Sequence, residues 1–222
     1  MINNIISLDL TKGNKMEIIT AKDFEDKNNI ETIEKLIRMN DGYITSKQIT
    51  EMGIHRMYLN IMKKRGLIKK VGNGIYIDKD KTPDPYYILS MELPNVVFSH
   101  ISALYLHNIA AKEPKQKFDI TVPNNYFNYK IKDQNVFYVN KEIYELGLTR
   151  VETSMGNLVK AYDPERCICD IIKSKKRIDH KVVMSCIKEY LSMRNRDLIK
   201  LFRYAYKLGI REEVISIIDS LE

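Results

Sequence analysis

The feature that most constrains this chain is the order of helix, turn and strand patterns between residues 28 and 78. Apolar residues at helical spacing predict a helix over residues 28–40, and a second, short helix is expected after Thr45 or Ser46. Gly53 then supplies a turn, a third helix is expected over 55–65, and two short strands form a hairpin over 67–77. This order is typical of a winged helix-turn-helix.

The details of this segment support the interpretation. Asn28 and Asn29 are suitable N-caps for the first helix, and Gly66 is a suitable stop for the third. Gly72-Asn73-Gly74 provides residues that tolerate positive φ at the hairpin turn. The positions expected to face the core are apolar: Ile30, Ile33, Leu36, Ile37, Ile49, Met52, Ile54, Leu59 and Met62.

The rest of the chain predicts a second domain. Residues 80–85, with two prolines, are expected to connect an N-terminal domain over 1–80 to a C-terminal domain over 86–222, and residues 1–22 are expected to be a tail or accessory segment. We therefore predict an α+β protein in which a winged helix-turn-helix precedes a mixed α/β domain that ends in helices.

Within the second domain, we expect a helix capped by Ser99 that runs to about Ile109. Strands are expected over 118–122 and 136–139, and a strand or hairpin over 144–155. The last part should be helical: Asp163-Pro164 begins one helix, and others are expected from Asp179, over about 195–208 and over about 212–221.

Charge indicates what the first domain binds. The net charge of +7 suits a polyanion only weakly, but residues 52–77 contain six basic residues and no acid. On the helix over 55–65, Leu59 and Met62 would pack inward and leave the other face for the major groove of double-stranded DNA. The residues expected to contact DNA are His55, Arg56, Met57, Asn60, Lys63, Lys64, Arg65, Lys69, Lys70 and Asn73.

Composition excludes other classes of protein. Three clustered cysteines do not make a disulfide framework, and neither a signal peptide nor a run of about eighteen apolar residues is present. We expect a cytoplasmic protein that does not bind a membrane.

Segments of both domains resemble the AbiEi-type antitoxins. In the first domain these are Gly-Ile-His-Arg-Met-Tyr-Leu at 53–59, Lys-Arg-Gly-Leu-Ile at 64–68 and Val-Gly-Asn-Gly-Ile-Tyr at 71–76. In the second they are Val-Phe-Ser-His-Ile-Ser-Ala-Leu-Tyr-Leu-His at 97–107, Thr-Val-Pro at 121–123 and Tyr-Asp-Pro-Glu-Arg-Cys-Ile-Cys-Asp at 162–170. The resemblance extends over residues 28–222.

The resemblance implies the antitoxin of a type IV toxin–antitoxin pair that acts in abortive phage infection. Such a protein represses its own operon by binding an inverted repeat through its N-terminal domain, and its C-terminal domain counters a nucleotidyltransferase toxin. One departure is His55, which stands where the family often has Ser. Because His is a poorer N-cap, we expect His55 to contact DNA instead.

Two other classes of function remain open from the sequence. One is a plain winged-helix transcription factor whose C-terminal domain senses a ligand or protein, and the other is an inhibitor that acts only by binding a protein. A neighbouring gene for a nucleotidyltransferase would favour the antitoxin.

Enzymatic alternatives fit the sequence poorly. Asp78 and Asp80 form an Asp-x-Asp without the Gly-Ser that a nucleotidyltransferase needs, and Pro114 interrupts the Glu113–Lys115 pattern that a nuclease would place on a strand. Ser99, His100 and His107 are expected to serve as a cap and as packing or surface residues. We expect no catalytic activity and no cofactor.

A metal site fits no better. Cys167 and Cys169 would point to different sides of a helix, about 200° apart. We therefore expect no metal, and we expect Cys167, Cys169 and Cys186 to be buried thiols.

Two charged groups in the second domain have a structural and a functional interpretation. Arg166 and Asp170 are four residues apart and should pair, with Glu165 in the first turn of the same helix; the alternative is contact with the toxin or DNA. The second group is a run of basic residues, expected in a solvated loop or on a face that contacts nucleic acid. It comprises Lys173, Lys175, Lys176 and Arg177.

Overall fold

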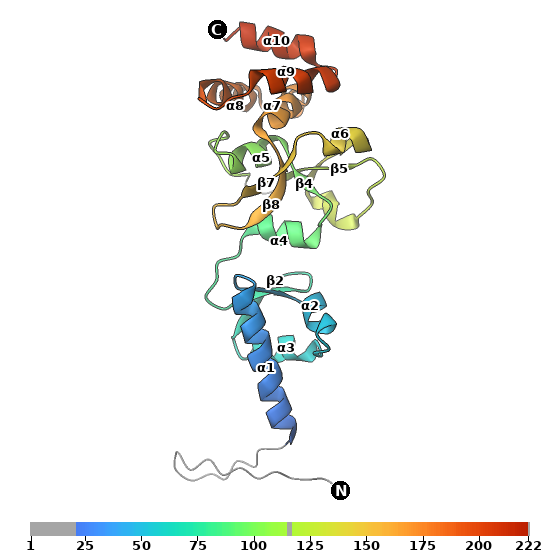
Figure 1. Cartoon of the computed structure of the whole chain (residues 1–222), viewed down its shortest axis with the longest axis vertical. Coiled ribbons are helices and arrows are strands. Elements are labelled where there is room, and N and C mark those ends of the chain that lie inside the picture. The colour runs from blue at the N-terminus through green and yellow to red at the C-terminus, as the bar shows by residue number, and fades with distance from the viewer. Residues whose placement is uncertain (1–20, 115–116, 222) are drawn as a thin grey trace. The chain divides into compact units, whose positions relative to one another are not determined.

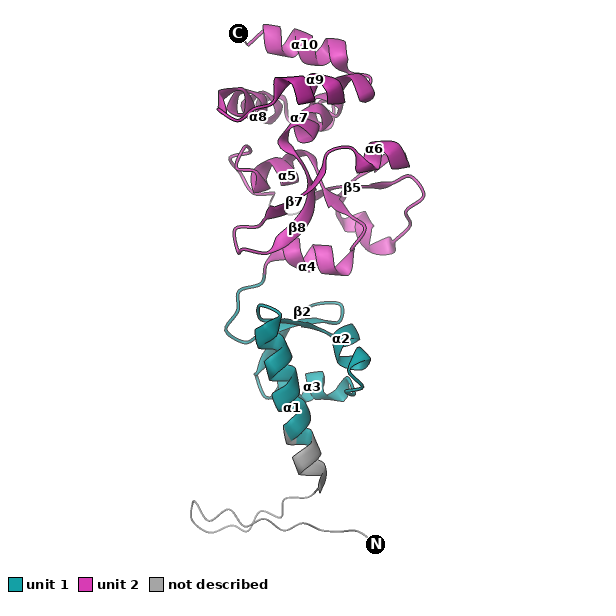
Figure 2. Ribbon diagram, viewed as in Figure 1, with its two compact units in different colours: residues 1–83 teal, residues 84–222 magenta. Residues whose placement is uncertain are grey.

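The computed structural model describes residues 21–114 and 117–221 (Figure 1). The chain divides into two compact units, residues 1–83 and 84–222 (Figure 2). The second unit begins two residues earlier than 86, because Asp84 caps the helix that starts at Pro85. Of the predicted tail over residues 1–22, residues 1–20 lie outside the described residues, while residues 21 and 22 already belong to a helix.

From residue 21 onward, where the structure describes it, the first unit combines three helices with a small antiparallel sheet. Its elements are α1 (Ala21–Met39), β1 (Tyr43–Thr45), α2 (Ser46–Glu51), α3 (Met57–Lys64), β2 (Ile68–Gly72) and β3 (Ile75–Asp78). The strands lie in the order β1-β3-β2, and α1 packs against β1 and α3. The side chains of Ile33, Ile49, Leu59 and Met62 are fully buried between the helices and the sheet. This is the predicted winged helix-turn-helix.

Three details of the first unit differ from the prediction. α1 begins at Ala21, so Asn28 and Asn29 lie inside the helix and do not cap it. Its first part is joined to α3, since the Tyr58 hydroxyl donates a hydrogen bond to Asp26 Oδ1 at 2.7 Å. Met52 follows the last turn of α2 and is 53% exposed, not directed into the core. α3 is also shorter than the predicted 55–65.

In its described residues, the second unit contains a five-stranded mixed sheet followed by four helices. Its first elements are α4 (Pro85–Glu92), β4 (Val97–Phe98), α5 (His100–Leu106), β5 (Asp119–Pro123), the 3-10 helix η1 (Tyr129–Asp133), β6 (Asn135–Val139) and α6 (Lys141–Glu145). Then follow β7 (Leu148–Glu152), β8 (Leu158–Tyr162), α7 (Pro164–Lys173), α8 (His180–Ser192), α9 (Leu198–Lys207) and α10 (Arg211–Asp219). The predicted mixed α/β arrangement that ends in helices is therefore confirmed.

The sheet has the strand order β6-β5-β4-β8-β7. The outer pairs are local, but β4 and β8 pair in parallel through Phe98 and Ala161, which are distant in sequence. The strands predicted over 118–122 and 136–139 correspond to β5 and β6. The segment 144–155, predicted as strand or hairpin, holds the end of α6 and all of β7. Elements α4, β4, η1, α6 and β8 were not predicted.

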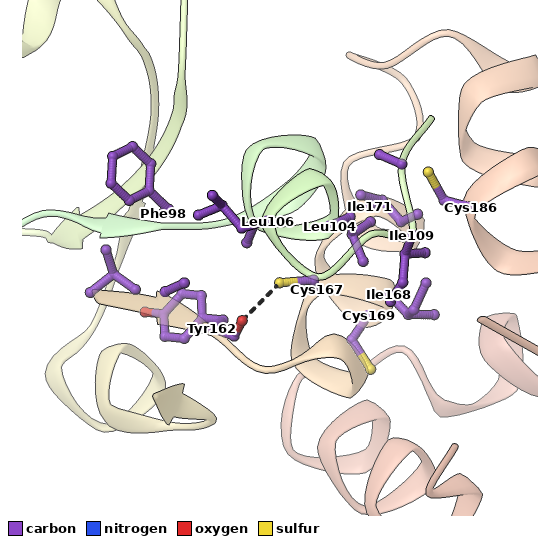
Figure 3. Packing of buried hydrophobic residues seen from close by; sticks show 14 of the residues in the cluster. Phe98, Leu104, Leu106, Ile109, Tyr162, Cys167, Ile168, Cys169, Ile171 and Cys186 are labelled. Atoms are coloured by element: carbon purple, nitrogen blue, oxygen red, sulfur yellow. Dashed lines mark hydrogen bonds between the residues drawn. The ribbon is translucent and has the colours of Figure 1, made fainter. Parts of the chain in front are cut away.

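Helix α7 is at the centre of the second unit and contacts α5, α8, α9 and α10. It begins as predicted, since the Asp163 side chain accepts a hydrogen bond from the Arg166 backbone N–H and Pro164 is its first residue. All residues from Glu165 to Ile172 are buried. In Figure 3, Cys167 points toward Leu106 of α5 and the Tyr162 carbonyl, whereas Cys169 points to another side of α7, where its thiol contacts the Leu201 carbonyl. No helix in the described parts of the chain is both long and apolar enough to span a membrane.

Candidate nucleic-acid interface

The segment that positions α3 is fixed by local hydrogen bonds. Thr45 and Gln48 form a reciprocal capping box: the Thr45 side chain accepts from the Gln48 N–H, and the Gln48 side chain accepts from the Thr45 N–H at 2.9 Å. After α2, Gly53 adopts φ of +75°, where a side chain would be strained. The Ile54 N–H then donates to the Ile49 carbonyl at 3.0 Å. The angle at which the chain enters α3 follows from these contacts.

Helix α3 has one buried and one exposed face. Tyr58, Leu59 and Met62 are buried, of which Leu59 and Met62 were predicted to pack inward. The residues predicted to contact DNA on and beside this helix are all exposed: His55, Arg56, Met57, Asn60, Lys63, Lys64 and Arg65. The fold therefore leaves this face available to a partner.

The N-terminus of α3 is organised by two side chains. The His55 Nδ1 atom accepts a hydrogen bond from the Met57 N–H at 3.2 Å, so His55 satisfies one of the free N–H groups at the start of the helix. Arg56 occupies the N-cap position without capping through its side chain. Its Nε atom donates instead to Thr50 Oγ1 in α2, at 3.0 Å. Sequence reasoning did not single out Thr50, because only the turn between the helices brings it to Arg56.

The hairpin of β2 and β3 forms the wing. Lys69 and Lys70 are consecutive residues of β2 and both are exposed, and the strand register is irregular between Lys70 and Gly72. At the tip, Asn73 is exposed and Gly74 has φ of +71°. The Ser46 N–H donates to the Gly74 carbonyl at 2.7 Å, so the wing tip is joined to the start of α2.

The surface of α3 and the wing is positively charged. Residues 52–77 contain no Asp or Glu. In the part of the first unit that the structure describes, the one ion pair is between the exposed side chains of Lys47 and Glu51 in α2, at 3.7 Å. An exposed basic surface of this kind is suited to a polyanion.

Residues 31–77, which include α2, α3 and the wing, match a family model described as a transcriptional regulator, AbiEi antitoxin. This segment of the first unit is therefore similar to the AbiEi antitoxin family. The fold is also similar to the crystal structure of the RV2827C protein from Mycobacterium tuberculosis, with a TM-score of 0.57 and 13% identity over 79% of this chain and 70% of that one. At this identity the similarity shows the fold alone. No match was found among curated proteins.

The polar group of the second unit lies inside the fold. Arg166 and Asp170 form the predicted i,i+4 pair, with Nε and Oδ1 2.9 Å apart and both side chains buried. The Nη1 atom of Arg166 also donates to the backbone carbonyls of Ile143 and Leu146. Glu165, which was predicted in the first turn, pairs with Lys200 at 2.9 Å.

The Asp170 carboxyl has a hydrogen-bond donor for only one of its two oxygens. Its Oδ2 atom is buried without a hydrogen-bond partner among the described residues. Burial raises the pKa of Asp170 to about 6, while the neighbouring Arg166 guanidinium acts to lower it. The Arg166–Asp170 pair therefore joins α7 to the loop before β7 at an electrostatic cost.

Most of the basic run that begins with the last residue of α7 makes contacts within the unit. Lys173 Nζ donates to the Leu208 carbonyl at 3.0 Å, and Lys175 forms an ion pair with Glu213 at 2.9 Å. The Arg177 guanidinium lies over the Phe137 ring, 4.3 Å from its centroid. Lys176 is exposed. Three of these four basic side chains therefore contact other residues of the second unit, whereas most basic side chains of α3 and the wing have no such contact among the described residues.

The cysteines and histidines also serve the packing. Cys167, Cys169 and Cys186 are buried free thiols, as expected, and among the described residues no group of three or more His, Cys, Asp or Glu side chains is arranged to hold a metal ion. His100 is buried and makes hydrogen bonds to Ser99 and Ser174. Ser99 is the N-cap of α5 as predicted, but its hydroxyl contacts His100 and Thr121 and makes no capping bond.

Proposed function

We propose that this chain is an AbiEi-type antitoxin that represses its own operon by binding an inverted repeat in the promoter, and that it counters a nucleotidyltransferase-like toxin as the antitoxin of a type IV pair. Both partners would place it in the cytoplasm. The toxin class and the autorepression are taken from the family resemblance.

One observation carries the DNA-binding part of this proposal. The exposed face of α3 and the adjacent wing present six basic side chains in a segment that contains no acid. A helix of this kind fits the major groove, where Arg and Asn side chains make bidentate contacts to guanine and adenine. Arg56 and Asn60 are the candidates for base contacts. The candidates for phosphate contacts are Lys63, Lys64, Arg65, Lys69 and Lys70, with Asn73 at the wing tip.

The second unit is proposed to counter the toxin. Its strongest charged cluster, around Arg166, is buried and maintains the fold. In the basic run, Lys173, Lys175 and Arg177 have partners within the unit. We therefore assign specific DNA recognition to the first unit.

A mobility-shift titration tests the DNA-binding part. The full-length protein and a duplex from the region upstream of its gene are mixed at increasing salt, with a scrambled duplex of equal length and composition as the control. If the five basic side chains other than Arg56 each neutralise a phosphate, log K should fall with log[salt] with a slope of about −4 to −5. Equal affinity for both duplexes at moderate salt would refute specific repression.

A growth assay tests the antitoxin part. The nucleotidyltransferase encoded next to this gene is expressed from an independent promoter, together with the full-length wild type or with a Lys69→Ala/Lys70→Ala variant. We expect both proteins to restore growth, and the variant to lose repression of a promoter–reporter fusion. If the variant fails to restore growth although it accumulates normally, the two activities are not divided as proposed.

A further inference from the structure

Thr50 is the next-to-last residue of α2, and its hydroxyl both donates and accepts a hydrogen bond. The Thr50 hydroxyl donates its proton to the Ser46 carbonyl at 2.9 Å. A hydroxyl has a single proton and two lone pairs, so its remaining capacity is as an acceptor. The Nε–H group of Arg56 uses that capacity at 3.0 Å. The bond to Ser46 thus sets Thr50 as an acceptor for Arg56.

This contact determines which part of the guanidinium faces outward. Arg carries five N–H donors in a planar fork, one on Nε and two on each terminal nitrogen. With Nε held by Thr50, the two terminal nitrogens remain for a partner. Glu51, next to Thr50, is paired with Lys47 at 3.7 Å. The end of the guanidinium matches the acceptor pair O6 and N7 at the major-groove edge of guanine.

We propose that Thr50 is a positioning residue that orients Arg56 to read a guanine in each operator half-site. This inference rests on the proposed binding of promoter DNA and names the base that the N-terminus of α3 selects. An exposed Arg normally loses side-chain freedom when it binds. Holding its Nε in advance reduces that loss, which is worth about three- to tenfold in affinity.

A double-mutant cycle tests the positioning role in the full-length protein. Thr50→Val, Arg56→Ala and the double variant are titrated against the promoter duplex. Thr50→Val removes the acceptor at nearly constant shape, and we expect about a three- to tenfold weaker Kd. In the Arg56→Ala background, the same change should have no further effect. Thr50→Ser keeps the hydroxyl and should bind within about twofold of wild type. An equal loss in both backgrounds, or no loss at all, overturns the inference.

A modified base tests the choice of guanine. Each guanine of a half-site is replaced in turn by 7-deazaguanine, which lacks the N7 acceptor. We expect one position at which this change weakens binding by the wild type but not by Arg56→Ala. If no position behaves in this way, Arg56 does not read guanine.

The outcomes that would refute the role of Thr50 can be distinguished from those that would refute specific DNA binding. A wild-type protein without preference for the promoter duplex would refute specific repression itself. A wild type that prefers the promoter, with a Thr50→Ser variant as weak as Thr50→Val, would refute only the role of Thr50. Thermal unfolding of each variant separates a binding defect from a folding defect.

Discussion

Helices α3 and α7 both carry charged side chains but place them in opposite environments. On and beside α3, Arg56, Lys63 and Lys64 are exposed, and residues 52–77 hold no acid to pair with them. On α7, Arg166 and Asp170 are buried and paired with each other. Charge that the fold itself satisfies is structural. Charge that the fold leaves exposed and unneutralised is available to a partner.

The buried guanidinium of Arg166 makes several polar contacts and one contact with an aromatic ring. Its Nε bonds to Asp170 and its Nη1 to two backbone carbonyls, while its guanidinium lies 4.2 Å from the centroid of the Tyr162 ring. Gly147 makes room for it: with φ of +76°, a Cβ there would lie 2.8 Å from Arg166 Cβ. One side chain thus joins α7 to the segment between α6 and β7.

Among the substitutions that test this comparison, we expect the largest effect at Arg166, on the free energy of unfolding. Arg166→Ala leaves the buried Asp170 carboxyl without its cationic partner, so that it either stays charged or takes up a proton at a further raised pKa, and the free energy of unfolding should fall by about 3–5 kcal/mol. Arg203→Ala, on the exposed face of α9, is the matched control and should change it by less than about 0.5 kcal/mol. Urea denaturation followed by circular dichroism measures both. Similar values for the two variants would mean that burial does not distinguish these arginines.

The contrast also explains what the sequence could predict. Local signals sufficed for α3, where Leu59 and Met62 fall on one helical face, and for the start of α7, where Asp163 and Pro164 are a typical cap and first residue. They also predicted the i,i+4 pairing of Arg166 with Asp170, because that contact lies within one helix.

Contacts between distant residues could not be predicted. The sequence left open whether the polar residues of α7 contact a partner, but packing against four neighbouring helices helps to bury them. Strand β4 has two residues and depends on its parallel pairing with β8. Asn28 and Asn29 are typical N-caps, yet α1 begins before them, at Ala21. Asp26, in this additional part of the helix, accepts a hydrogen bond from the Tyr58 hydroxyl. The contact of Thr50 with Arg56 likewise depends on the turn at Gly53.

The next largest effect concerns base recognition by α3. Arg56→Ala and Asn60→Ala should each reduce the preference for the promoter over scrambled DNA by about 1–3 kcal/mol, because each would remove a bidentate base contact. Their unfolding should stay near that of the wild type, in contrast to Arg166→Ala. Competition titrations with both duplexes measure the preference. A uniform loss on both duplexes would make Arg56 a phosphate contact.

Two histidines differ in the same way, and the buried one should make the free energy of unfolding depend on pH. His55 is exposed beside α3, whereas His100 is buried, stacked on Phe137 and bonded to Ser174 at the end of α7. Burial lowers the pKa of His100 well below 6.5, and Arg166 and Arg177 add to this effect. Below pH 6.5 the unfolded chain therefore binds a proton that the folded chain does not.

We expect His100 to make the free energy of unfolding fall as pH decreases below 6.5, by up to about 1.4 kcal/mol per pH unit. His100→Asn should flatten this dependence, since Asn does not titrate and tolerates the φ of +47° at this position. His55→Asn controls for the loss of a histidine on the surface. Urea denaturation at several pH values measures the slopes. An unchanged slope in His100→Asn would assign the pH dependence to other groups.

The smallest effect is expected at the wing. Lys70 is an exposed residue of β2, so Lys70→Ala should not alter the fold, and if it contacts phosphate it should weaken all duplexes about equally. The slope of log K against log[salt] should become less negative by about 1. Lys175→Ala is the matched control, because Lys175 is engaged with Glu213 at 2.9 Å and should leave the slope unchanged. A loss confined to the promoter duplex would instead place Lys70 at a base and extend sequence recognition from α3 to the wing. A shift in the slope with Lys175→Ala would show that charge in the second unit also contributes to DNA binding.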